Sequence, residues 1–242
     1  MEVELFIPCF IDQLYPNTAW NCIKLLEKAG CKVHYNPKQT CCGQPSFNSG
    51  YWDKTRTMAK KFITDFKPNI PIVSPSGSCT GFVRNHYPEL FEEKDAEWQE
   101  QAQDITQHIF EITDFLVNQI QFTDFGAVFN HSITYHDSCS ALREYGIREE
   151  PRLLLSKVKG LQLTEMNESD TCCGFGGTFS AKFDGISSSM AEQKVQNTLD
   201  TEAEFITGTE SSCLMHIEGY INKNNKAIKT IHIVDILASG WE

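Results

Sequence analysis

Hydrophobic and polar positions alternate along the chain in blocks that predict short strands separated by amphipathic helices. Residues 3–8 and 70–75 are apolar runs of strand length, and the second is continuously apolar. Such a run is typical of a parallel strand buried on both faces. Residues 17–30 repeat apolar side chains at helical spacing and end at Gly30, which is a common helix stop. The pattern predicts an α/β fold.

The same order of elements is expected twice. In the first half we predict strand, helix, strand, helix and strand at residues 3–8, 17–30, 31–36, 51–66 and 70–75. In the second half the corresponding segments are 132–137, 151–160, 161–166, 185–200 and 203–208. Between the halves, the spacing of Ile105, Ile109, Ile112 and Leu116 predicts one long amphipathic helix over residues 95–119.

Cysteines mark this repeat. Thr-Cys-Cys-Gly occurs at 40–43 and again at 171–174, an offset of 131 residues. Two further cysteine pairs recur at offsets of 130 and 134 residues, namely Cys9 with Cys139 and Cys79 with Cys213. We therefore predict two pseudo-repeat halves, residues 1–125 and 126–242, each a small, mostly parallel sheet flanked by helices.

Composition and charge narrow the class of protein. The chain has 242 residues, 40% of them hydrophobic and 22% charged, as in an ordinary globular protein. Its net charge of −11 would repel a phosphate backbone, so nucleic acid is not expected as a partner. The N-terminal residues lack the features of a signal peptide, and no apolar run is long enough to span a membrane. The expected location is the cytoplasm.

Ten cysteines are unusual for a chain expected in a reducing compartment, and they indicate metal or redox chemistry rather than disulfides. Each cysteine of the repeat follows a predicted strand. Because ligands bind at the carboxyl edge of parallel sheets, four thiols should converge there in each half. Four thiolates suit an iron–sulfur cluster or tetrahedral zinc. The predicted ligands are Cys9, Cys41, Cys42 and Cys79 in the first half, and Cys139, Cys172, Cys173 and Cys213 in the second.

These motifs resemble the CCG-type cysteine-rich domain, which occurs in a subunit of heterodisulfide reductase and in the iron–sulfur subunit of glycolate oxidase. The segments that carry this resemblance are IPCF, both TCCG loops, SGSC, YHDSC and SSCLMH. The match covers essentially the whole chain. The length, without a ferredoxin-like insert, looks most like the lactate-utilization members. The resemblance implies an electron-transfer subunit with one 4Fe–4S cluster per half. It would work with other subunits, including an iron–sulfur protein, in oxidising a 2-hydroxy acid, namely L-lactate to pyruvate.

The sequence departs from the fullest family pattern. The heterodisulfide reductase members end each motif in Cys-x-x-Cys and use five cysteines for a non-cubane cluster. Here Phe82 and His216 stand at those last positions, so cubane and non-cubane clusters both stay open. Zinc in one or both halves, with a scaffold role, is an alternative. A dithiol–disulfide oxidoreductase that uses the paired cysteines is another.

The remaining candidates lie beside the motifs. His136 and Asp137 precede Cys139 and are interpreted as groups that hydrogen-bond a cluster or move protons, or as a satisfied histidine and a capping aspartate. His216 is a further candidate ligand or neighbour of the second site. Cys22 and Cys31 have no counterpart in the repeat. Cys22 lies on the apolar face of a predicted helix and is expected in the core, and Cys31, which begins a predicted strand, is expected to be structural.

Overall fold

The computed structural model of the chain describes residues 1–67, 69–91 and 95–241. Each half forms a four-stranded sheet in which all neighbouring strands are parallel. The strand orders are β2-β1-β3-β4 and β6-β5-β7-β8, so the two sheets have the same topology. The prediction of an α/β protein with two pseudo-repeat halves is confirmed.

The first half follows the predicted succession of elements. Its strands are β1 (Glu2–Leu5), β2 (Lys32–Tyr35), β3 (Ile72–Ser74) and β4 (Ile109–Glu111). Its helices are α1 (Cys9–Leu14), α2 (Pro16–Lys28), α3 (Gln44–Asn48), α4 (Trp52–Asp65), α5 (Gly77–His86), η1 (Pro88–Leu90), α6 (Ala96–His108), α7 (Ile112–Asp114) and η3 (Phe115–Gln119). All three residues of β3 are buried, as the continuous apolar run predicts.

The second half repeats this plan. Its strands are β5 (Ser132–Tyr135), β6 (Gln162–Leu163), β7 (Phe205–Gly208) and β8 (Lys229–His232). Its helical segments are the π-helical turn η4 (Ser140–Tyr145), α8 (Glu149–Leu155), α9 (Thr178–Lys182), α10 (Asp184–Leu199), α11 (Ser211–Lys223) and α12 (Ile233–Leu237). None of the helices in the described part of the chain is long and apolar enough to cross a membrane.

The single long helix predicted over residues 95–119 is wrong. Helix α6 ends at His108, and the chain then forms strand β4, which pairs with β3. Ile109 and Glu111 are buried in this strand. An apolar residue every three or four positions suits a helix followed by a short buried strand equally well, because the strand is only three residues long.

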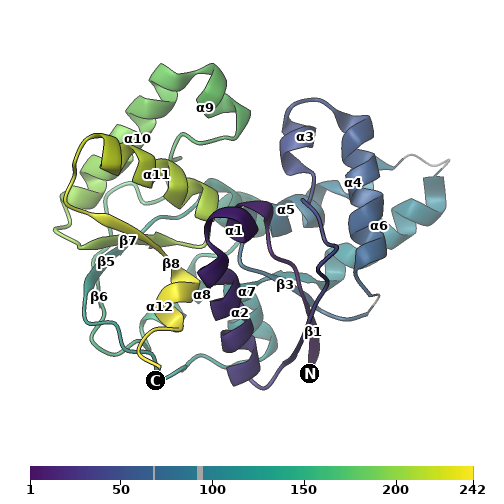
Figure 1. Cartoon of the computed structure of the whole chain (residues 1–242), viewed down its shortest axis with the longest axis horizontal. Helices are drawn as coiled ribbons and strands as arrows, with labels where there is room; N and C mark the ends of the chain where they lie inside the picture. The colour runs from purple at the N-terminus through teal and green to yellow at the C-terminus, as the bar shows by residue number, and fades with distance from the viewer. Residues whose placement is uncertain (68, 92–94, 242) are drawn as a thin grey trace.

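The two halves share one hydrophobic core, which includes Leu26 of α2, Ile133 of β5 and Ile236 of α12. Helix α12 lies against α2, where Asp235 accepts hydrogen bonds from Thr18 and Asn21 at 2.8 and 2.9 Å. Figure 1 shows α3 with α4 and α9 with α10 as two lobes on the side of the molecule opposite the chain termini. The carboxyl ends of β1, β3, β5 and β7 lead into the segments that carry the single repeated cysteines, and β2 and β6 precede the two Cys-Cys pairs.

Candidate metal centre

One cavity between the halves brings the eight repeated cysteines together. Its volume is about 480 Å³. The cysteines that line it are Cys9, Cys41, Cys42, Cys79, Cys139, Cys172, Cys173 and Cys213. The other two, Cys22 and Cys31, are buried in the shared hydrophobic core. The structure therefore separates the repeated cysteines from the unmatched ones in space, as the sequence separates them by spacing.

The first quartet shows close contacts between its sulfurs. Cys9 Sγ lies 3.9 Å from Cys41 Sγ, and Cys42 Sγ lies 3.4 Å from Cys79 Sγ. Both halves have the same burial pattern: the first cysteine and the leading cysteine of the Cys-Cys pair are half-buried, and the other two are buried. Each site is thus open to the cavity on one side and enclosed by protein on the other.

Helix starts position several of these thiols. Cys9 is the first residue of α1, Cys79 is the third of α5 and Cys213 is the third of α11. The amino-terminal turn of a helix presents unpaired N–H groups and the positive end of the helix dipole, both of which stabilise a thiolate. The strand-to-helix connections of the fold therefore supply a favourable environment for anionic sulfur.

The Thr-Cys-Cys-Gly loops fold in the same way in both halves. Gly43 and Gly174 have φ angles of 95° and 92°, in the left-handed region that favours glycine. Their N–H groups point back to the first cysteine of the pair, at 3.4 Å from Cys41 Sγ and 3.4 Å from Cys172 Sγ. The shared geometry of the two loops explains why glycine follows the paired cysteines.

The thiols of each quartet perturb one another. Hydrogen bonds from Cys42 and Cys9 lower the pKa of Cys41 to about 3, and the N–H of Gly43 adds to this effect. In the second half, hydrogen bonds from Cys139 and Cys173 lower the pKa of Cys172 to about 2. The leading cysteine of each pair is therefore a thiolate at neutral pH, which is the form that binds metal.

Glu210 lies on the wall of the cavity and links the two halves, a role that the sequence reasoning missed. Its carboxylate accepts the backbone N–H of Ser78 at 2.8 Å and the hydroxyl of Ser76 at 3.2 Å. Burial raises its pKa to about 7. The repeat does carry a signal for this residue, because Glu210 of FITGTESSC takes the position of Ser76 in PIVSPSGSC.

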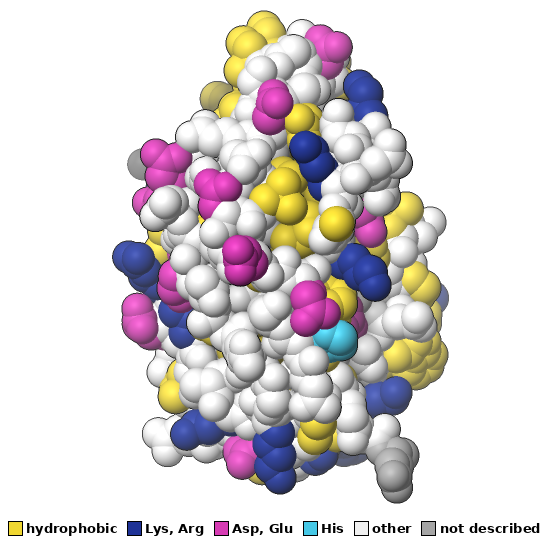
Figure 2. Space-filling view, turned by 90° about the vertical axis from the view of Figure 1, so that its left-hand side faces the viewer, with side chains coloured by type: hydrophobic (Ala, Val, Ile, Leu, Met, Phe, Trp, Pro, Cys, Tyr) yellow, Lys and Arg dark blue, Asp and Glu magenta, His cyan; other side chains and the backbone are white. Residues whose placement is uncertain are grey.

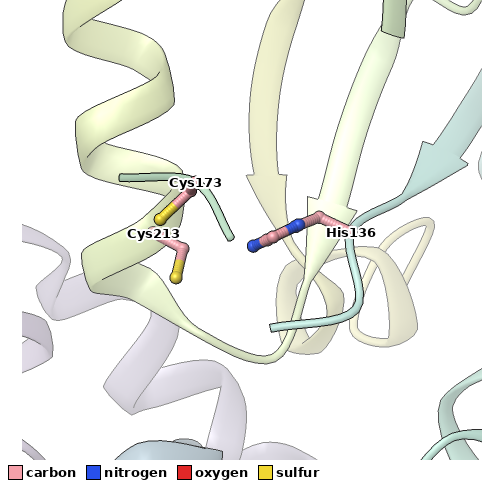
Figure 3. A group of neighbouring side chains, drawn as sticks. All are labelled: His136, Cys173 and Cys213. Atoms are coloured by element: carbon pink, nitrogen blue, oxygen red, sulfur yellow. The ribbon is translucent and has the colours of Figure 1, made fainter. Parts of the chain in front are cut away.

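His136 is buried beside the second quartet, with 1% of its surface exposed. Its ring points toward Cys173 and Cys213 (Figure 3), and the ligand atoms of the three residues all lie within 4.8 Å of one another. Among the residues that the structure describes, neither ring nitrogen has a hydrogen-bond partner. Such a buried, unpartnered imidazole suits metal binding.

Asp137 and His216 have other partners. Asp137 pairs with Arg152 through bonds of 2.9 and 2.8 Å and also accepts the hydroxyl of Ser169. Burial opposes the charge of Asp137, but the hydrogen bonds from Arg152 and Ser169 outweigh it and lower its pKa. His216 Nε2 lies 3.1 Å from the hydroxyl of Ser187 on α10.

The donor set fits a thiolate-bound metal. Two sulfurs bound to one tetrahedral metal at about 2.3 Å lie about 3.8 Å apart. The measured separations of 3.9 Å for Cys9 and Cys41 and 3.4 Å for Cys42 and Cys79 are close to this value. In the second half the ligand atoms of Cys173, Cys213 and His136 lie within 4.8 Å of one another. The clustered cysteines of both halves therefore suit metal binding, and thiolates serve both iron–sulfur clusters and zinc.

Comparisons with known proteins agree with this geometry. A family model described as CCG, cysteine-rich domain, matches residues 3–84 and 133–218. Lactate utilization protein A of Bacillus subtilis (strain 168) is 42% identical over 239 residues, covering 99% of this chain and 100% of that protein. Lactate utilization protein A of Oceanobacillus iheyensis is 40% identical and covers 100% of this chain and 98% of that protein.

The fold is also seen among solved structures. A hypothetical protein from Helicobacter pylori matches with a TM-score of 0.63 and 14% sequence identity. The match covers 100% of this chain and 49% of that one, so this chain spans about half the length of the Helicobacter protein. At this level of identity the likeness concerns the fold alone.

Proposed function

The chain belongs to the CCG cysteine-rich domain family, and on that premise we propose that it is an iron–sulfur electron-transfer subunit of a complex that oxidises a 2-hydroxy acid. The likeness to Lactate utilization protein A supports a role in lactate utilization. The proposed reaction is the oxidation of L-lactate to pyruvate. The observation that carries the proposal is the meeting of all eight repeated cysteines in one cavity.

The residues of this chain would bind and enclose one 4Fe–4S cluster in each half. A bound cluster supplies one-electron transfer. The ligands in the first half are Cys9, Cys41, Cys42 and Cys79, and those in the second are Cys139, Cys172, Cys173 and Cys213. The N–H groups of Gly43 and Gly174 stabilise the leading thiolates. Hydrogen bonds to sulfur are also one of the means by which a protein sets a cluster's potential.

Electrons need a route to and from partner subunits, which we propose include an iron–sulfur protein. The half-buried thiols of Cys9, Cys41, Cys139 and Cys172 face the open cavity, so this side of the molecule is the proposed approach for partners. On the face shown in Figure 2, acidic and basic side chains are interspersed and no single large basic patch appears. We place the complex in the cytoplasm, where thiols stay reduced.

Zinc is the second candidate for the metal, and it would make the chain a scaffold. The observation that favours it is the group of His136, Cys173 and Cys213, whose donor atoms lie within 4.8 Å of one another. Imidazole with thiolates is a common zinc donor set. A dithiol–disulfide oxidoreductase is supported by the 3.4 Å contact between Cys42 and Cys79.

Metal content of anaerobically purified protein tests these proposals. We expect about four irons and equivalent sulfide per half by the 4Fe–4S assignment, with a paramagnetic resonance signal that changes on reduction. Cys41→Ser and Cys172→Ser should each remove the iron of one half. The control is Cys22→Ala, which deletes a thiol from the hydrophobic core and should leave iron content unchanged.

Stoichiometric zinc without iron would support the scaffold instead. Metal-free protein that reduces disulfides and loses this activity on alkylation would support the oxidoreductase. Full metal content and full activity of the complex with both serine variants would refute the ligand assignment.

A further inference from the structure

The two candidate sites are not copies of each other, and the difference begins at His136. The repeat aligns His136 with Phe6, because Cys139 and Cys9 each lie three residues further on. Backbone hydrogen bonds confirm this alignment. The N–H of Phe6 donates to Val73 at 2.9 Å, and the N–H of His136 donates to Thr207 at 2.8 Å, which is the equivalent residue by the cysteine register.

The surroundings of the first quartet are aromatic. Phe6 is fully buried and meets Phe62 edge-on, with ring centroids 4.8 Å apart. Phe82 packs near the same quartet, and all three belong to the hydrophobic cluster that contains Cys42 and Cys79. At these three positions the first half therefore carries aromatic rings without nitrogen.

In the second half these three aromatic positions carry nitrogen. The offsets between equivalent cysteines and helices of the two halves show which positions correspond. His136 corresponds to Phe6, Lys194 to Phe62 and His216 to Phe82. Lys194 is 1% exposed, and its ammonium group donates to the carbonyls of Glu168 and Ser169 at 2.7 and 3.1 Å. His216 bonds Ser187. Lys194 and His216 thus have hydrogen-bond partners in the protein, whereas His136 has none in the described part of the chain.

The position of His136 makes it a donor for the second quartet. Its two ring nitrogens lack hydrogen-bond partners within the described ranges 1–67, 69–91 and 95–241, although the residue is 1% exposed. A buried imidazole without a partner is costly, and such groups are rare unless an unseen ligand satisfies them. The ligand atoms near it are Cys173 Sγ and Cys213 Sγ, all within 4.8 Å of one another, and Figure 3 shows the ring directed at these two side chains.

We propose that the imidazole of His136 binds the metal of the second half directly, together with Cys173 and Cys213. This assignment rests on the proposal that the second half binds metal. It makes the two centres chemically unlike, with thiolates alone in the first half and thiolates with an imidazole in the second. On this assignment the imidazole takes the place of one of the four thiolates assigned above to the second half. Because imidazole in place of thiolate raises the reduction potential of an iron–sulfur centre, the second centre accepts electrons more readily than the first.

The test uses the full chain, purified without oxygen, in a Cys41→Ser background so that signals come from the second half. Protein labelled with ¹⁵N-histidine is compared with unlabelled protein. If iron is bound, pulsed electron paramagnetic resonance should show a strongly coupled histidine nitrogen that changes with the isotope. If zinc is bound, X-ray absorption should show nitrogen at about 2.0–2.1 Å beside sulfur at about 2.3 Å.

Two histidine-to-phenylalanine variants show which histidine gives the nitrogen signal. His136→Phe and His216→Phe each introduce the residue that the first half carries at that position. We expect His136→Phe to abolish the nitrogen signal and to lower the midpoint potential of an iron centre, and we expect His216→Phe to retain both. Circular dichroism checks that each variant is folded. If His136→Phe does not fold, the isotope comparison in His216→Phe decides between the two histidines near the second quartet, because this variant keeps His136 and lacks His216.

The outcomes separate this inference from the proposed function. Metal held by sulfur alone, or a nitrogen signal that survives His136→Phe, overturns the assignment of His136 and leaves metal binding intact. A nitrogen signal lost in His216→Phe but kept in His136→Phe also overturns it. Protein in which neither half of the unmodified chain holds iron or zinc overturns both the assignment and the proposed function.

Discussion

At the residue scale, the glycines of the two Thr-Cys-Cys-Gly loops are constrained to different degrees. Both have positive φ angles, so any other residue would be strained. A Cβ at Gly43 would only touch Thr55 at 3.4 Å, whereas a Cβ at Gly174 would lie 2.7 Å from the carbonyl oxygen of Ser187. The second loop is therefore held against α10 by direct backbone contact, and the first is not.

Glu111 gives a pH-dependent contribution to stability that a single substitution should remove. Burial raises its pKa from 4.5 to about 8 in the folded protein, so the native state keeps a proton that the unfolded chain loses near pH 4.5. Its contribution is fully present below about pH 4.5 and is lost as the pH rises toward 8. The slope is at most about 1.4 kcal/mol per pH unit within this window.

Thermal unfolding of Glu111→Gln between pH 4.5 and 8 checks this expectation. The variant should lose less stability than the original protein as the pH rises. Glu100→Gln, which changes an exposed carboxylate on α6, should follow the original protein. Parallel curves for the original protein and Glu111→Gln would contradict the expectation.

How far the sequence predicts the site depends on the residue. Spacing alone selects the eight cysteines that line the cavity. Two copies of a Cys-Cys pair, each with two further cysteines in the same register, indicate that the eight share one role. Spacing does not place Glu210, whose function depends on Ser76 and Ser78 of the other half. Nor does it show that Asp137 is held by Arg152, since that contact depends on how α8 packs beside β5.

At the element scale, α5 of the first half and the π-helical turn η4 of the second half are in close contact. A Cβ added at Gly77 would lie 2.8 Å from the Cα of Ala141, and one at Gly81 would lie 3.3 Å from the Cβ of Glu144. The two glycines are four residues apart and so share one face of α5. Their missing side chains allow the segment that carries Cys79 to approach the segment that follows Cys139.

Gly77→Ala should therefore separate these elements. We expect a loss of about 1–3 kcal/mol in the free energy of unfolding, because overpacking moves backbone as well as side chains. Gly219→Ala is the matched control, since Gly219 lies on α11 with nothing near its added Cβ, and alanine there should stabilise the helix by about 0.5–1 kcal/mol. Chemical denaturation measures both, and equal effects of the two substitutions would show that the close contact does not matter.

Strand β4 is the element that apolar spacing predicts wrongly. The spacing joins it to α6 and α7 as one helix. In the structure β4 followed by α7 is equivalent to β8 followed by α12. A strand of three residues is too short to show a period of two, so periodicity cannot separate it from the helices on either side.

At the scale of the whole molecule, the pseudo-symmetry places equivalent residues against each other. Ser76 and Glu210 occupy the same position in the two halves and hydrogen-bond across the interface. Glu210 has a carboxylate where Ser76 has a hydroxyl, and this difference breaks the symmetry. His136, at the position equivalent to Phe6, is a second such difference. The repeat thus builds one shared cavity, and a few exchanged residues give its two sides different chemistry.

The shared core predicts that the halves are one folding unit although they repeat each other. Buried Leu26 and Ile236 belong to a single cluster drawn from both halves, and Asp235 fixes α12 to Thr18 and Asn21 of α2.

Fragments 1–125 and 126–242, cut at the predicted boundary, would each expose half of this cluster to water. We expect neither fragment to show a cooperative thermal transition by circular dichroism, and the intact chain to show one. Mixing the fragments should restore helical signal, because the core then reforms between them. A fragment that melts cooperatively alone, or two transitions in the intact chain, would mean that each half is stabilised by its own sheet and helices.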